Sequence, residues 1–263
     1  MIKVLVSGAY GRMGRTVVNA VINDEELELV GAVDVIGGAD TGELTGHGKN
    51  GIIIETDLAK AIENTKPEVM VDFTQPSVVF NNAIIALEYK VSPVIGTTGL
   101  SDEAKEKIRQ TSEKFDTPVF IAPNFAIGAV LMMLLSKQVA KYMPDVEIIE
   151  LHHDKKLDAP SGTAELTAKM ITEVREQHKQ GHPNEEEKMP HVRGADYEGI
   201  RIHSVRLPGY VAHQEVIFGG LGQTLTIRHD STGRDSFMPG VVLACKKVRS
   251  LKGLTIGLDK LLD

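Results

Sequence analysis

The sequence predicts an α/β protein of two domains, the first built on a doubly wound parallel sheet. Short apolar runs alternate with helical patterns over the first half of the chain, which is typical of parallel strands covered on both faces. The pattern changes after about residue 126, where closely spaced strand patterns predict a second α+β domain with a mixed or antiparallel sheet. These two observations set the fold class.

The first half reads as alternating strands and helices. An apolar strand over 2–6 is followed by a helical pattern over 13–22, and a second strand over 27–33 ends directly before Asp34. The segment 35–51 contains six glycines, so we expect a mobile loop there. Further strands are expected at 69–73, 93–95 and 119–121, and further helices at 57–64, 76–89 and 101–115.

The second half contains fewer and longer helices. We expect an apolar helix over 128–142, a strand over 146–152, a helix over 163–178 and a polar surface loop over 180–190. Three strands follow at 199–206, 212–218 and 223–229, and the glycine-rich link 219–222 between the last two is typical of a hairpin. The strand 223–229 alternates, which leaves one face for solvent or a partner. A helix over 237–249 and a leucine-rich tail end the chain.

We therefore predict a dinucleotide-binding domain at 1–126 and a substrate-binding and oligomerisation domain at 127–236. The last segment, 237–263, is expected to pack back on the first domain. Because strand–helix alternation stops near residue 126 and a single helix follows the last hairpin, these boundaries are the natural ones.

Composition excludes several function classes. The 263 residues contain 29 Lys and Arg against 36 Asp and Glu, a net charge of −7, so no basic surface for nucleic acid or membrane is expected. The single cysteine, Cys245, excludes an intrachain disulfide and a multi-thiolate metal site, and its apolar neighbours predict a packing role. No apolar stretch reaches the ~18–20 residues of a membrane span, and the chain starts on a strand without a leader. We expect a cytoplasmic protein.

Three glycines follow the first strand. Gly8, Gly11 and Gly14 let the backbone approach a phosphate at the start of the next helix, although tight turns also use glycine for steric reasons alone. Asp34 favours the first interpretation. It stands 20 residues beyond Gly14 at the end of the second strand, where a carboxylate can bind the adenosine ribose. The unit predicts a Rossmann-type dinucleotide site.

Two loops follow predicted parallel strands, namely Gly96–Thr97–Thr98–Gly99 and Ala122–Pro123–Asn124–Phe125. Both are expected at the carboxyl edge of the sheet, where ligands bind in such folds. Ordinary loop chemistry explains each loop equally well when it is considered alone.

The segment 150–163 reads E-L-H-H-D-K-K-L-D-A-P-S-G-T. Its two histidines and two lysines offer donors for anions and an acid that titrates near neutral pH. A metal site is not expected, because neighbouring strand residues such as His152 and His153 point to opposite faces. Ser161 lacks the G-x-S-x-G elbow of a nucleophile. Ser161, Gly162 and Thr163 instead read as a helix start that would hold a carboxylate, or as a cap without a ligand.

Together these motifs resemble the dihydrodipicolinate reductase family, also called 4-hydroxy-tetrahydrodipicolinate reductases, of bacterial lysine and diaminopimelate biosynthesis. The resemblance covers nearly the whole chain and rests on Gly11–Arg12–Met13–Gly14, the loops 96–99 and 122–125, and the H-H-x-x-K-x-D-A-P-S-G-T run at 152–163. It implies hydride transfer from NADH or NADPH to a cyclic imine dicarboxylate, usually in a homotetramer.

The resemblance also implies a role for individual residues. His152 matches the proton donor or acceptor and Lys156 the proton donor, while His153, Gly162 and Thr163 match substrate-binding positions. The nucleotide-binding positions are matched by Gly8, Ala9, Tyr10, Gly11, Arg12, Met13, Asp34, Gly96, Thr97, Thr98, Ala122, Pro123, Asn124 and Phe125.

One position departs from the family pattern. Members that accept NADPH well often carry arginine directly after the acidic residue, and this chain has Val35 there. We expect NADH to be preferred and NADPH to remain possible, with Lys49 as a partial substitute for the arginine. Two other functions stay open, a dehydrogenase of another small acidic substrate and an NAD(H)-binding sensor. A sensor has no need for the His152 and Lys156 pair, which counts against it.

Overall fold

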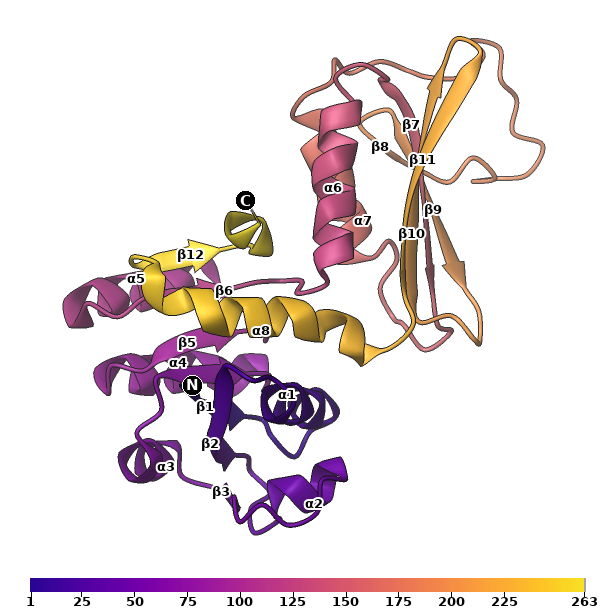
Figure 1. The fold of residues 1–263 in the computed structure, drawn as a ribbon. Helices are drawn as coiled ribbons and strands as arrows, with labels where there is room; N and C mark the ends of the chain where they lie inside the picture. The colour runs from indigo at the N-terminus through magenta and orange to yellow at the C-terminus, as the bar shows by residue number, and fades with distance from the viewer. Residues whose placement is uncertain (263) are drawn as a thin grey trace. The chain divides into compact units, whose positions relative to one another are not determined.

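The structure is a computed structural model that describes residues 1–262. The chain divides into two compact units, each with its own sheet (Figure 1). Unit 1 consists of Met1–Ile127 together with Arg234–Asp263, and unit 2 of Gly128–Gly233. Within residues 1–262, no helix combines the length and the apolar character that crossing a membrane requires.

Unit 1 contains a seven-stranded parallel sheet in the order β12-β6-β5-β4-β1-β2-β3. Its strands are β1 (Ile2–Ser7), β2 (Leu27–Val33), β3 (Ile54–Glu55), β4 (Val69–Asp72), β5 (Ser92–Ile95), β6 (Val119–Ile121) and β12 (Leu254–Ile256). Its helices are α1 (Arg12–Ile22), α2 (Thr41–Thr45), α3 (Leu58–Thr65), α4 (Pro76–Glu88), α5 (Asp102–Phe115) and α8 (Met238–Lys247), with short 3₁₀ turns at Arg234–Phe237, Val248–Ser250 and Leu258–Leu261.

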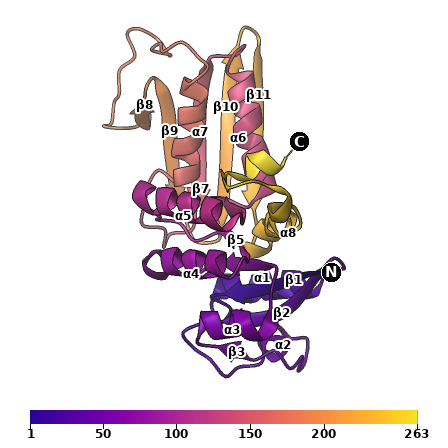
Figure 2. The same cartoon turned by 90° about the vertical axis from the view of Figure 1, so that its left-hand side faces the viewer.

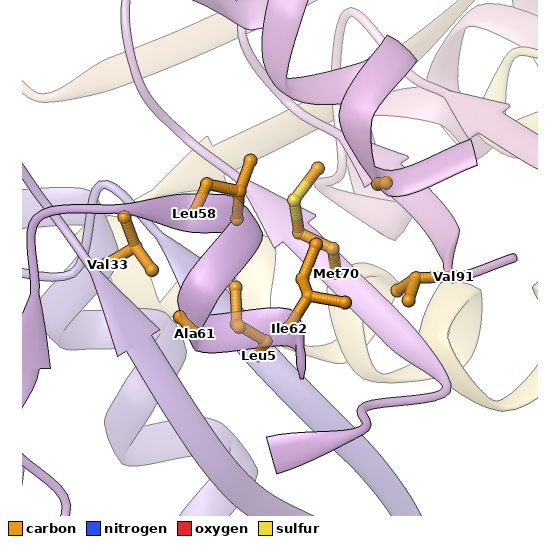
Figure 3. Packing of buried hydrophobic residues seen from close by; sticks show 8 residues of the cluster. Leu5, Val33, Leu58, Ala61, Ile62, Met70 and Val91 are labelled. Carbon is orange, nitrogen blue, oxygen red and sulfur yellow. The ribbon is translucent and has the colours of Figure 1, made fainter. Parts of the chain in front are cut away.

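Helices cover both faces of this sheet, as the continuous apolar strands predicted. Helices α3, α4 and α5 lie on one face, and α1 and α8 pack together on the other (Figures 1 and 2). Every residue of β4 and β5 is buried. The side chains of Leu5 on β1, Ile62 on α3 and Met70 on β4 belong to one packed cluster (Figure 3). The prediction of a doubly wound parallel sheet is confirmed.

The segment 35–51 is not the simple loop that its glycines suggested. It contains α2, and buried Asp40 organises the whole segment. Its carboxylate accepts hydrogen bonds from the backbone N–H groups of Gly42, Glu43, Asn50 and Gly51, at 2.9 to 3.3 Å. The segment expected to be a mobile loop thus contains a short helix, and a single capping carboxylate satisfies four of its backbone donors.

The end of the chain adds a strand that the sequence pattern did not predict. After α8 and a 3₁₀ turn, β12 pairs in parallel with β6 and forms the outermost strand of the sheet. Buried Leu258 and Leu261 follow it. Helix α8 contacts α1 and the strands β1, β4 and β5.

Unit 2 contains a five-stranded mixed sheet in the order β11-β10-β7-β9-β8. The elements are α6 (Ile127–Val139, which begins on the last residue before the unit), β7 (Asp145–His152), α7 (Gly162–Thr172), β8 (Ala195–Tyr197), β9 (Ile200–Arg206), β10 (Ala212–Gly220) and β11 (Gln223–Ser231). Strands β7 and β9 run parallel, and the other pairs run antiparallel. The hairpin predicted at 219–222 joins β10 and β11.

Two helices of unit 2 are shorter than their sequence patterns. Helix α6 ends at Val139, ahead of Pro144, which disfavours helical backbone in the residue before it. Helix α7 ends at Thr172 rather than near His178. Buried Arg175 follows, and its guanidinium donates to the carbonyls of Pro144 and His178, which folds the chain back toward β7.

Candidate active site

The glycine turn of unit 1 is shaped by close backbone contacts. Gly8 has φ +83°, and a Cβ added to it would lie 2.5 Å from the Phe73 carbonyl oxygen. A Cβ on Gly14 would lie 1.9 Å from the Gly8 carbonyl oxygen, whereas one on exposed Gly11 would meet nothing closer than 3.3 Å. The fold itself therefore requires Gly8 and Gly14. Gly11 is the N-cap of α1 and has no side chain that could cover the helix start.

The start of α1 suits an anion. No side chain caps it, and its first turn contains no acidic residue. The backbone N–H groups of a first turn have no partner inside their own helix, and they lie at the positive end of the helix dipole. A phosphate would supply the missing acceptors there.

Asp34 accepts a hydrogen bond from the same turn. Its Oδ2 accepts a hydrogen bond from the backbone N–H of Tyr10 at 2.9 Å, and its Oδ1 one from Ile36 at 3.3 Å. The guanidinium of Arg15 lies 4.6 Å from the centre of the Tyr10 ring and donates to the Tyr10 carbonyl at 2.9 Å. Because a carboxylate has about four acceptor sites, Asp34 keeps capacity for ribose hydroxyls.

Val35 and Lys49 are the two residues expected to decide whether a 2′-phosphate is accepted. Val35, next to Asp34, is 89% exposed and presents only methyl groups to solvent. Lys49, the suggested substitute, lies 3.8 Å from a carboxylate oxygen of Glu43. Its charge is therefore partly balanced within its own loop.

A buried carboxylate at the carboxyl edge of the sheet was missed by sequence reasoning. Asp72 ends β4, beside β1, where the strand order reverses and ligands bind in such folds. It accepts hydrogen bonds from the Thr74 backbone N–H (3.0 Å) and hydroxyl (2.7 Å), from the Thr97 hydroxyl (2.9 Å) and from the Asn82 amide (2.8 Å). The signal was present, since Asp72, like Asp34, is an acidic residue at the end of an apolar strand.

This network limits what Thr97 can offer a ligand. Its hydroxyl also accepts from the Thr74 backbone N–H at 2.8 Å, and its side chain is buried. Thr98 and Gly99 are the exposed residues of this loop. The hydroxyl of Thr97 thus links the loops that follow β4 and β5 at the carboxyl edge of the sheet.

The loop 122–125 contains both a buried side chain that packs in the core and an exposed residue. Phe125 is buried, with its ring 5.8 Å from that of Phe73 and 6.0 Å from that of Phe120. Gly96 has to be a glycine here, because a Cβ would lie 2.2 Å from the Phe73 ring. Pro123 is exposed, and the Asn124 side chain accepts from the Ala126 backbone N–H at 2.8 Å.

Unit 2 changes from apolar to polar along one face of its sheet. Strand register puts residues of β9, β7, β10 and β11 side by side in rows. The successive rows are Ile202–Ile148–Val216–Ile227, then Ser204–Glu150–Gln214–His229, then Arg206–His152–Ala212–Ser231. The middle row faces α7, because the Gln214 amide donates to the Thr167 hydroxyl at 2.8 Å. The polar rows lie at the end of β7 that leads into the 153–161 loop.

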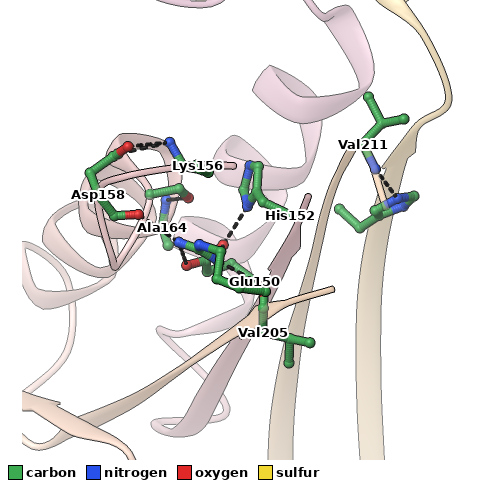
Figure 4. Close-up of polar contacts among 10 residues, drawn as sticks. Glu150, His152, Lys156, Asp158, Ala164, Val205 and Val211 are labelled. Carbon is green, nitrogen blue, oxygen red and sulfur yellow. Dashed lines mark hydrogen bonds and ion pairs between the residues drawn. The ribbon is translucent and has the colours of Figure 1, made fainter. Parts of the chain in front are cut away.

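Glu150 is the centre of the polar rows. It is fully buried, and the guanidinium of Arg206 donates to both of its oxygens, at 2.7 and 2.9 Å. The Nδ1 atom of His152 bonds the same carboxylate (Figure 4). Burial raises the pKa of Glu150, but hydrogen bonds from His152, Arg206 and Ser204 outweigh it and lower that pKa to about 2. The carboxylate that bonds the imidazole is therefore ionised at neutral pH.

Lys156 lies in the loop that follows β7. Its ammonium group is 2.7 and 2.8 Å from the two carboxylate oxygens of Asp158, and this bond lowers the pKa of Asp158 (Figure 4). The Asp158 carbonyl accepts from Arg206 at 2.7 Å. One network thus contains His152 and Lys156, while the neighbouring His153 is exposed.

Helix α7 begins where the sequence predicted a helix start. The Ser161 hydroxyl caps it by accepting from the Ala164 backbone N–H at 3.2 Å. A Cβ placed on exposed Gly162 would have nothing within 4 Å, so the first turn faces open space. An anion could approach it directly. Within residues 1–262, no cluster of three His, Cys, Asp or Glu side chains could hold a metal ion.

The chain resembles one family over its whole length. The family model "Dihydrodipicolinate reductase, N-terminus" matches residues 2–125, and "Dihydrodipicolinate reductase, C-terminus" matches residues 128–262. The 4-hydroxy-tetrahydrodipicolinate reductases of Desulfitobacterium hafniense and Moorella thermoacetica are 54% and 51% identical to it, over 100% of this chain and 99% and 98% of theirs.

Solved structures agree with this result. The dipicolinate-bound dihydrodipicolinate reductase from Paenisporosarcina sp. TG-14 superposes with a TM-score of 0.89 at 48% identity, over 99% of both chains. The WlbA dehydrogenase from Thermus thermophilus, in complex with NAD and α-ketoglutarate, has a TM-score of 0.60 at 11% identity, over 99% of this chain and 91% of that one. This second likeness concerns the fold alone.

Proposed function

The chain belongs to the dihydrodipicolinate reductase family, and from this premise we propose that it reduces 4-hydroxy-tetrahydrodipicolinate to tetrahydrodipicolinate in lysine and diaminopimelate biosynthesis. The net reaction adds a hydride and a proton and releases the 4-hydroxyl group as water. A bound nicotinamide dinucleotide supplies the hydride. The observation that carries the proposal is the Glu150–His152–Arg206–Asp158–Lys156 network, which offers cations and a proton to a dianionic ring.

The residues of unit 1 would hold the dinucleotide. The uncapped start of α1, reached past Gly8 and Gly11, fits the pyrophosphate, and the spare acceptor sites of Asp34 fit the adenosine ribose. Tyr10, Arg12 and Met13 line the same turn, while Gly96 to Thr98 and Ala122 to Phe125 stand at the sheet edge where the nicotinamide end would lie. Through these contacts the protein would orient the cofactor.

The residues of unit 2 would hold the substrate and move the proton. The open first turn of α7 at Gly162 and Thr163 fits one carboxylate, and exposed His153 is available to the other. Lys156 would offset the charge that develops on the ring nitrogen, and His152 would donate or accept the proton. These roles require the ammonium group of Lys156 to exchange Asp158 for the substrate.

We propose NADH as the preferred cofactor, with NADPH accepted less well. Asp34 would repel a 2′-phosphate, exposed Val35 offers it no hydrogen bond, and Glu43 already pairs with Lys49. We also propose a homotetramer in the cytoplasm. The support for assembly is the outermost strand β11, whose outer edge pairs with no strand within residues 1–262 and which follows the fully exposed Leu221.

A steady-state assay tests the function. The substrate is formed in situ by condensing pyruvate with aspartate semialdehyde, and oxidation of NADH or NADPH is followed by absorbance. We expect turnover that depends on both precursors. Oxidation with another small acid alone would support a different dehydrogenase, and cofactor binding without turnover would support the sensor.

A further inference from the structure

Arg206 joins the two segments that carry the candidate catalytic side chains. It ends β9, and its strand partner on β7 is His152. Its Nη1 and Nη2 atoms donate to the two carboxylate oxygens of Glu150 at 2.9 and 2.7 Å. The Nη2 atom also donates to the Asp158 carbonyl at 2.7 Å. A planar guanidinium can make these bonds at once because its donors are held in a rigid fork.

Glu150 determines which nitrogen of His152 carries the proton. An ionised carboxylate only accepts hydrogen bonds, so the Nδ1 atom that contacts it has to donate. The neutral ring is then the Nδ1–H tautomer, with its lone pair on Nε2. In the part of the chain that the structure describes, Nε2 bonds to nothing, and the His152 side chain keeps 15% of its surface exposed.

Asp158 links Arg206 to Lys156. Arg206 fixes the main chain at Asp158, and the carboxylate of Asp158 binds the ammonium group of Lys156 through both oxygens. The loop is otherwise exposed over most of its length. The bond from Arg206 is therefore an anchor between the sheet and the loop that carries Lys156.

We propose that Glu150 and Arg206 are positioning residues for the reaction, with Glu150 setting the tautomer and ring orientation of His152 and Arg206 anchoring the loop that carries Lys156. Replacing a whole buried ion pair by apolar side chains of similar size is often neutral for stability, although removing one partner alone is strongly destabilising, so stability does not by itself explain why a charged pair stands here. That these residues serve the reaction rests on the proposed function, whereas the tautomer of His152 can be tested without turnover.

The first measurement uses the unmodified protein. Histidine side chains are labelled with ¹⁵N, and NMR at a pH where the rings are neutral distinguishes the two tautomers; a His152→Asn sample identifies the signals of that ring among the nine histidines. We expect the Nδ1–H tautomer at His152. The Nε2–H tautomer would overturn the assignment to Glu150.

The second measurement compares three variants. Glu150→Gln leaves one acceptor oxygen where Arg206 and His152 need two. Arg206→Lys keeps Glu150 paired with a cation, so it tests the loop anchor even if Glu150→Gln does not fold. The control is Glu147→Gln, because Glu147 lies on the same strand and also bonds an arginine and a histidine, Arg193 (2.5 Å) and His203 (2.8 Å), away from the loop.

We expect Glu150→Gln and Arg206→Lys to lower kcat about 10–100-fold, as for other residues that orient a functional side chain, with the KM for NADH within twofold of the parent. In Arg206→Lys the tautomer of His152 should stay unchanged. Glu147→Gln should keep kcat within twofold. Near-normal kcat in Arg206→Lys, or an equal loss in Glu147→Gln, would overturn the positioning role. If the parent itself shows no turnover, the proposed function fails and the NMR result still decides the tautomer.

Discussion

At the scale of single residues, Glu150 is a fully buried carboxylate whose pKa lies well below that of an exposed glutamate. Its ordinary pKa of 4.5 falls to about 2 in the folded state. A lowered carboxyl pKa stabilises the folded state above the unfolded pKa, and this contribution is lost as pH falls toward the folded pKa. At ~1.4 kcal/mol per unit, the contribution is on the order of 3 kcal/mol.

Acid unfolding tests this contribution. Glu150→Gln should lower the urea midpoint strongly at pH 7, and the gap to the parent should narrow as pH falls from about 5 to about 2.5. The control is Glu106→Gln, whose carboxylate also has a pKa lowered to about 2 by Arg109 but is exposed and screened by solvent. That variant should stay close to the parent throughout. A gap for Glu150→Gln that did not change with pH would contradict the assignment.

Cofactor choice is a second prediction at this scale. Two like charges about 4 Å apart repel by roughly 1 kcal/mol even in water, so Asp34 should disfavour the 2′-phosphate of NADPH. We expect the parent to prefer NADH on the order of tenfold, about 1.4 kcal/mol. Val35→Arg should raise kcat/KM for NADPH more than for NADH at one ionic strength. A parent that prefers NADPH, and that Val35→Arg leaves unchanged, would assign the choice to another residue.

The sequence pointed to some site residues more readily than to others. His152 and Lys156 stand in one short run beside a helix start, so their chemistry could be read from adjacent letters. Arg206 is 56 residues from Glu150 and reaches it only because β9 pairs in parallel with β7. Asp72 itself ends an apolar strand, but its partner Thr97 could be found only by knowing which loops meet at the sheet edge. Such partners depend on strand order and register, which no local pattern contains.

At the scale of elements, the glycines of the turn after β1 have two different functions, since Gly14 is required by the fold and Gly11 leaves room for a ligand. A Cβ on Gly14 would lie 1.9 Å from the Gly8 carbonyl oxygen, so Gly14→Ala has to move the backbone of the turn. We expect it to lower stability by about 1–3 kcal/mol, as overpacking does, and to weaken NADH binding as a consequence.

Gly11→Ala is the matched variant, because the nearest protein atom would be 3.3 Å away and φ is −67°. Its melting temperature should change little, while its Kd for NADH should rise on the order of tenfold (about 1.4 kcal/mol) because the methyl group faces the phosphate position. Thermal melts and NADH fluorescence titrations measure both. Equal losses of stability in the two variants would contradict this division.

Elements that their own residues define could be predicted, and elements that depend on a neighbour could not. Strands β1, β4 and β5 are mostly apolar, and helices α1 and α5 keep helical spacing, so their own residues define them. Strands β8 and β12 are three residues each and exist because β9 and β6 offer them an edge. Helix α2 depends in the same way on Asp40, which bonds residues up to Gly51.

At the scale of the whole molecule, the predicted fold class is confirmed by two separate sheets, one parallel and one mixed. The mixed sheet ends at β11, a nine-residue strand with exposed Leu225 on it and exposed Leu221 beside it. An unpaired edge of this length is a template for association.

We therefore expect light scattering to give a mass about four times the 28.6 kDa of the chain. Replacing Leu225 with lysine should shift that mass downward, since a charge on an exposed strand opposes edge pairing. The Leu131→Lys control, on α6, should leave the mass unchanged because that exposed leucine is not on the edge strand. A parent that is monomeric at working concentration would contradict the proposed assembly.

The central claim is a division of labour, in which unit 1 binds the dinucleotide and side chains of unit 2 carry out the proton chemistry. The most direct measurement is Lys156→Ala, with NADH affinity and steady-state turnover determined on the same preparation. The account predicts an unchanged Kd for NADH and a kcat lowered roughly 10²–10⁴-fold, as for a lost acid or charge stabiliser. Near-normal turnover, or loss of NADH binding in parallel with activity, would contradict it.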